Sequence, residues 1–155
     1  MRARLEIFKG AYANHDCIEN VINYISDRED VLLFGQGCSS IPETAIQDFY
    51  IVNAFYQPKG TRYLRHFVIS FKVNRDLNNP LIIQFANYAA NYYSSEYQIF
   101  YGIMNDNGHI HIHFCQNMTN YRNGSKFPRS LEEKLNFLNY LNNFPGIEVT
   151  SNNFY

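Results

Sequence analysis

The sequence has no tryptophan, and its three cysteines, Cys17, Cys38 and Cys115, show no CxxC spacing. Cysteines that are odd in number and far apart are not typical of a disulfide scaffold or a zinc ribbon. No apolar run approaches the roughly 20 residues of a membrane-spanning helix. The stretch after Met1 alternates and lacks the hydrophobic segment of a signal peptide. We therefore expect a soluble, cytoplasmic protein with no membrane partner.

A positive excess is also missing, because the formal net charge is −1. Many nucleic-acid-binding domains are strongly basic, so this observation counts weakly against DNA binding. A local basic patch can still exist on a neutral protein. The chain is rich in aromatic residues instead, with 13 tyrosines and 13 phenylalanines, and aromatic rings can stack on the bases of a single strand. Its 155 residues fit one domain, residues 1–155, with one core.

Hydrophobic periodicity and turn residues predict four helices separated by strands. The expected strands are residues 1–10, 63–73, 97–104, 109–115 and a closing strand at 146–149, with at most a short strand at 31–34 in an otherwise irregular segment. The expected helices begin at Asn14 or Asp16, Pro42, Asn79 and Ser130, and end near residues 26, 55, 95 and 142. Tight turns at 105–108 and 123–124 indicate hairpins, and hairpins require antiparallel pairing. This order predicts an α+β fold, a central antiparallel sheet of about five strands with helices packed on it.

Three of the five histidines, His109, His111 and His113, alternate with apolar residues on one expected strand. Side chains alternate across a strand, so all three point to one face and the apolar residues face the core. Neighbouring side chains on that face lie about 6.5–7 Å apart, and two imidazoles at that spacing can reach one ion. The pattern predicts a metal or phosphate site built from a histidine pair and a ligand from elsewhere. The spacing does not decide which pair is used.

The same histidines carry a resemblance to a known family. The string from His109 to Phe114, followed by Asn117, resembles the signature strand of relaxases of the HUH endonuclease superfamily, in their mobilisation-protein (MobA/VirD2-like) branch. Four further segments resemble family motifs in the right order: residues 20–25, 37–49, 65–71 and 121–127. The resemblance covers nearly the whole chain. It implies a single relaxase-like nuclease domain with the HUH-type, ferredoxin-like palm.

The resemblance also implies a chemistry. Tyr24, which would otherwise be an ordinary helix residue, corresponds to the nucleophile that attacks single-stranded DNA, forms a 5′-phosphotyrosine and frees a 3′-hydroxyl. His111 and His113 correspond to ligands of a divalent metal, Mn²⁺ or Mg²⁺. The implied partners are the origin-of-transfer hairpin of a plasmid or mobile element and accessory relaxosome proteins. Arg65, Lys72 and Asn117 are candidate DNA contacts, although basic residues near strand ends are equally often solvated.

The chain departs from the family pattern at one metal-ligand position. The family's first metal-binding histidine lies seven residues before the second, where this chain has Met104. A thioether is a poor ligand for hard ions such as Mg²⁺ or Mn²⁺. His109, Asp106 and His66 are the candidates to complete the site, and the sequence does not rank them.

Two alternative functions follow. The substitution at Met104 favours a catalytically weakened relaxase-like module that binds DNA without cutting it. The other alternative is a rolling-circle replication-initiation nuclease of the HUH class, which would use a tyrosine on a helix after the histidine strand, here Tyr140. Tyr12, near the end of the first strand, is a reserve nucleophile.

Overall fold

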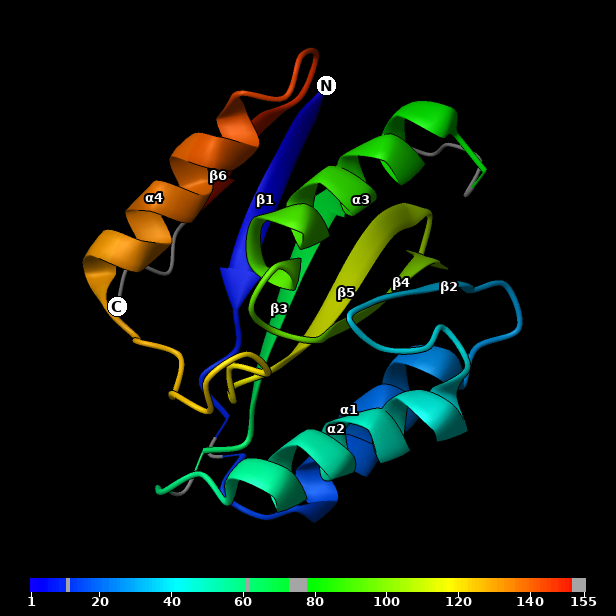
Figure 1. Cartoon of the computed structure of the whole chain (residues 1–155). Coiled ribbons are helices and arrows are strands. Elements are labelled where there is room, and N and C mark those ends of the chain that lie inside the picture. Colours follow the sequence, from blue (N-terminus) through cyan, green and yellow to red (C-terminus); the bar gives the residue numbers. More distant parts are fainter. Residues whose placement is uncertain (11, 61, 73–77, 152–155) are drawn as a thin grey trace.

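The computed structural model describes residues 1–10, 12–60, 62–72 and 78–151, and in them it shows one sheet and four helices (Figure 1). The strands are β1 (Arg2–Ile7), β2 (Leu32–Gln36), β3 (Leu64–Phe71), β4 (Ile99–Asp106), β5 (His109–Asn117) and β6 (Glu148–Ser151). The helices are α1 (Asp16–Ser26), α2 (Pro42–Tyr56), α3 (Pro80–Ser94) and α4 (Leu131–Asn142). None of these helices is long and apolar enough to cross a membrane.

The sheet has the strand order β2-β4-β5-β3-β1-β6. The pairs are antiparallel except the last, in which β6 runs parallel to β1. The predicted α+β class is confirmed, but the sheet has six strands rather than about five and is mixed rather than purely antiparallel. The additional regular strand is β2, which pairs with β4 along its whole length. Helix α4 precedes β6, and β6 lies at the edge of the sheet beside β1.

Helices cover both faces of the sheet (Figure 1). Helices α3 and α4 pack on one face, with a core that includes Phe67, Ile112 and Phe114. Helices α1 and α2 pack on the other face, in a second core that includes Met104 and Cys115. Strand alternation therefore directs the histidines of β5 toward the α1/α2 side.

Two predicted helix starts are confirmed by their caps. The Asn79 side chain accepts a hydrogen bond from Leu81 N at 3.0 Å, and the Ser130 hydroxyl accepts one from Glu133 N at 3.1 Å. The expected hairpin at residues 123–124 is instead a turn closed by a single bridge between Thr119 and Lys126. The turn shape follows from Gly124, whose positive φ of 77° suits glycine.

Candidate active site

His111 and His113 occupy the centre of the sheet, on a strand with neighbours on both sides. In the ladder with β4, His111 lies opposite Met104 and His113 lies opposite Gly102. The two ring centroids are 6.0 Å apart. This spacing agrees with the expectation for consecutive same-face residues of one strand.

His66, on the adjacent strand β3, joins this pair. Its Nε2 lies 3.1 Å from Nδ1 of His113, and both rings are buried. Burial lowers the pKa of His66 to about 4. Burial, reinforced by the charges of His66 and His111, lowers the pKa of His113 to about 3. Both imidazoles are therefore neutral at pH 7, and one donates a hydrogen bond to the other.

The other ring nitrogen of His113, Nε2, is buried and has no hydrogen-bond partner in the described part of the chain. A buried polar atom without a partner is costly in a site that stays empty. When His113 Nδ1–H donates to His66 Nε2, the lone pair of His113 Nε2 is left for a ligand. A metal-binding histidine usually donates its other ring N–H to an acceptor, and this hydrogen bond fixes the tautomer and the orientation of the ring.

Tyr24 reaches the same place from α1. Four residues of that helix at helical spacing are buried: Ile18, Val21, Ile22 and Ile25. Tyr24 falls beside this buried stripe and its side chain is 49 % exposed. Its ring centroid lies 5.6 Å from that of His113 and 6.2 Å from that of His66. The phenol is thus open to solvent and next to the histidine pair.

Gly102 explains how α1 comes so close to the sheet. A Cβ at this position would lie 2.8 Å from Cγ2 of Ile25 and 2.9 Å from a methyl of Val31. Only glycine leaves room for the helix beside His113. The role of Gly102 was not predicted from the sequence, although a glycine inside a strand is a known sign of close backbone approach.

Asp106 and Arg28 form the outer side of the site. The Asp106 carboxylate lies 3.9 Å from Nδ1 of His111 and 3.7 Å from the guanidinium of Arg28. The guanidinium carbon of Arg28 is also 5.7 Å from the Tyr24 ring centroid. Arg28 was not identified from the sequence, because nothing in its local pattern distinguishes it from other solvated arginines. His109 is exposed at the start of β5, opposite Asp106, and the described ring contacts do not connect it to the other histidines.

The described residues provide no group of three histidine, cysteine, aspartate or glutamate side chains able to hold one metal ion. Met104, at the expected ligand position, is 1 % exposed and packs in the apolar core under α1 and α2. His111 and His113 remain as a two-imidazole pair with the unpartnered Nε2 of His113. Mg²⁺-type ions often use one or two protein ligands and complete their shell with phosphate oxygens and water. The residues present fit an ion held in that way.

The three predicted DNA contacts lie in different environments. Arg65 is 4 % exposed, and its guanidinium bonds to the Glu133 carboxylate at 3.4 Å. Asn117 is fully buried and donates to the side chain of Gln98 at 3.0 Å. Lys72 is exposed just after β3. Lys72 alone of the three presents its side chain at the surface.

Arg65 has a structural environment that predicts a stability effect. Its guanidinium carbon lies within 4.9–5.9 Å of four aromatic ring centroids, and Glu133 also accepts a hydrogen bond from Tyr93. Arg65→Gln should lower the free energy of unfolding by about 2 kcal/mol, because it leaves the largely buried Glu133 carboxylate without its cation. Urea denaturation followed by circular dichroism measures the change, with Lys72→Gln as the exposed control. An unchanged urea midpoint in Arg65→Gln would contradict this role.

The other two candidate tyrosines are placed differently. Tyr140 stacks on Tyr88 between α4 and α3, and each hydroxyl donates to the other residue's carbonyl oxygen at 2.7 Å. Tyr140 thus belongs to the sheet face opposite the histidines. Tyr12 lies nearer, with its hydroxyl 3.4 Å from Nδ1 of His66. Of the two, only Tyr12 touches the histidine cluster.

A family model described as relaxase, MobA/VirD2-like, nuclease domain, matches residues 18–142. No curated protein and no solved structure matches the chain significantly. The matched segment contains all but the first two residues of α1, the three central strands and the histidines of β5.

Proposed function

The chain belongs to the relaxase family, with a MobA/VirD2-like nuclease domain, and we propose that it nicks single-stranded DNA by attack of the Tyr24 hydroxyl. Family membership implies a DNA-nicking nuclease or strand transferase that binds single-stranded DNA. The assignment of Tyr24 as the nucleophile goes beyond what family membership implies. The observation that carries it is the half-exposed Tyr24 ring at 5.6 Å from His113, on the histidine side of the sheet.

The proposed step is a transesterification. The Tyr24 oxygen forms a bond to phosphorus, and the bond between phosphorus and the 3′-oxygen breaks. The phenolic proton ends on the 3′-oxygen, so the products are a 5′-phosphotyrosine on the protein and a free 3′-hydroxyl on the DNA. The positive charge of Arg28, 5.7 Å from the Tyr24 ring, favours the approach of the phosphate anion.

Relaxase domains generally use a divalent metal, and His111 and His113 are the residues that would hold it here. Bound Mn²⁺ or Mg²⁺ would polarise the scissile phosphate and offset its negative charge. His66 would orient His113 through the 3.1 Å hydrogen bond, and Asp106 would orient His111. In this proposal His66 and Asp106 support the ligands rather than replace the missing histidine.

We assign the biological substrate as the origin-of-transfer hairpin of a plasmid or mobile element, recognised together with accessory relaxosome proteins. The test incubates the protein with Mn²⁺ and 3′-labelled single-stranded oligonucleotides that carry candidate origins. The proposal predicts a labelled protein band of reduced mobility on a denaturing gel, because the 3′-labelled fragment stays joined to Tyr24. A 5′-labelled copy of the same oligonucleotide should give a shortened fragment that is free of protein. Folded protein that binds the oligonucleotides without forming that band would favour the second candidate, a non-cleaving DNA-binding module. Met104 at the ligand position is the observation that supports this second candidate.

Met104 also provides a gain-of-function prediction. Met104→His places a third imidazole opposite His111 and should tighten Mn²⁺ binding by at least about tenfold, since groups that only orient a ligand already change metal affinity by about 10- to 100-fold. Electron paramagnetic resonance of free Mn²⁺ measures the affinity without any DNA. Met104→Leu is the matched control and should bind Mn²⁺ as the unchanged chain does. Equal affinity in the two variants would show that this position does not face the ion.

A further inference from the structure

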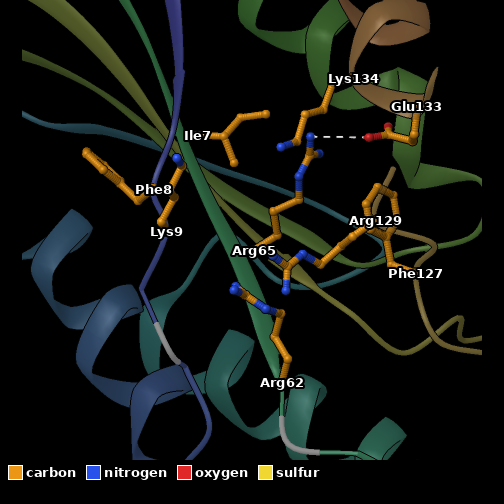
Figure 2. Close-up of a pocket in the computed structure, with 9 residues that line it drawn as sticks. All are labelled: Ile7, Phe8, Lys9, Arg62, Arg65, Phe127, Arg129, Glu133 and Lys134. Atoms are coloured by element: carbon orange, nitrogen blue, oxygen red, sulfur yellow. Dashed lines mark hydrogen bonds and ion pairs between the residues drawn. The ribbon is translucent and has the colours of Figure 1, made fainter. Parts of the chain in front are cut away.

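A partly enclosed cavity lies on the side of β3 opposite the histidines, and most of its lining side chains are positively charged (Figure 2). Five basic side chains line it: Lys9, Arg62, Arg65, Arg129 and Lys134. These are five of the 13 lysines and arginines in a chain whose net charge is −1. The cavity has one acidic residue, Glu133, which is paired with Arg65. The lining therefore has a net excess of positive charge.

The geometry of the arginines fits an anion. Arg62 lies just before β3, and Arg129 lies in the segment before α4. Figure 2 shows their side chains directed toward one another. The pKa of Arg62 is lowered by burial first and by the nearby charge of Arg129 second. Two guanidinium groups that repel each other across a cavity are relieved by an anion between them, and guanidinium groups bind phosphate oxygens in a bidentate manner.

The cavity is next to the histidine site. Phe8 lines the cavity, and its ring centroid lies 4.6 Å from that of His66. Arg62 lies over the Tyr12 ring at 5.9 Å, and the Tyr12 hydroxyl contacts His66. Phe8 and Tyr12 therefore connect the edge of the basic cavity to His66.

We propose that the cavity lined by Arg62 and Arg129 binds a backbone phosphate of the single strand and so positions the strand relative to Tyr24. This inference rests on the proposed function for the identity of its ligand. Phosphate contacts fix the register of a nucleic acid without reading its sequence. The cavity would therefore contribute affinity and salt dependence for any sequence.

The test measures equilibrium binding of fluorescein-labelled dT20 by anisotropy, in the presence of a chelator and across a salt series. Arg62→Gln and Arg129→Gln are compared with Arg2→Gln, a charge-matched control on the exposed start of β1. Each cavity variant should weaken binding about tenfold at low salt and reduce the salt slope by about 0.7 for the lost phosphate contact. Arg2→Gln should change neither quantity by a comparable amount.

Two further probes identify the ligand. An uncharged methylphosphonate analogue of dT20 should bind the cavity variants and the unchanged chain equally, since it has no anion for the cavity. Inorganic phosphate should compete with dT20 only weakly. If it binds the cavity more tightly than the strand does, the cavity is a site for free phosphate and the inference fails.

Unchanged dT20 affinity and salt slope in both cavity variants would also overturn the inference. Should Arg62→Gln fail to fold, Arg129→Gln decides the matter, because Arg129 is exposed. Because dT20 binding requires no cleavage, the outcome is independent of the tyrosine chemistry. If the protein forms no adduct but the cavity variants bind dT20 more weakly, only the proposed function is refuted. If the protein forms the adduct but the cavity variants bind dT20 as the unchanged chain does, only this inference is refuted.

Discussion

Tyr24→Phe should reduce formation of the covalent protein–DNA adduct by at least about 1,000-fold, because it removes the only atom that attacks phosphorus. The variant keeps the ring that contacts His113 and His66. Folding and strand binding should therefore remain close to those of the unchanged chain. The measurement is a time course on denaturing gels with labelled single-stranded DNA and Mn²⁺.

Tyr12→Phe is the matched control for this experiment. Tyr12 also contacts His66, but its hydroxyl is held 3.4 Å from that ring and its pKa is raised mainly by burial. A raised pKa makes the phenolate less accessible at neutral pH. We expect Tyr12→Phe to retain the adduct. Loss of the adduct in Tyr12→Phe with retention in Tyr24→Phe would move the nucleophile to residue 12.

His111→Ala should slow adduct formation about 100-fold, because it removes one of the two imidazoles proposed to hold the metal ion at the scissile phosphate. His111 is partly exposed, so its removal leaves no large cavity in the core. His109→Ala is the matched control, because His109 lies on the same face of the same strand and is exposed. We expect His109→Ala to stay within about twofold of the unchanged chain, consistent with the modest effect of most surface substitutions.

A second readout separates a metal-binding role of His111 from a purely structural one. Mn²⁺ binding, measured by electron paramagnetic resonance in the presence of uncleaved DNA, should weaken in His111→Ala and stay unchanged in His109→Ala. Equal losses in both variants, or a larger loss in His109→Ala, would contradict the assignment of the pair.

The histidine face was predictable because it depends only on strand alternation. His111 and His113 share a face with an apolar counter-face, and this follows from a period of two along one segment. The contribution of His66 was not fixed in this way. It depends on the register in which β3 pairs with β5. That register places His66 opposite Cys115, two residues along β5 from His113 and on the same face. Register is set by long-range packing and turn geometry, so the sequence left His66 as one of three candidates.

The burial of Arg65 could have been predicted from strand alternation, but it was not. It has the same parity on β3 as Phe67, so alternation already directs it toward the core under α3 and α4. Its aromatic surroundings and its partner Glu133 come from α3, the 127 region and α4, which are far apart in the sequence. The parallel pairing of β6 with β1 was missed for a similar reason, because it joins opposite ends of the chain. Local patterns do not report contacts of that separation.

The most direct test of the account is to locate the nucleotide on the protein. The adduct is digested with nuclease and trypsin, and the modified peptide is sequenced by tandem mass spectrometry. The account predicts a nucleotide joined through its 5′-phosphate to Tyr24, the tyrosine of α1. A modification on Tyr12 or Tyr140, or cleaved DNA with no modified tyrosine, would contradict it.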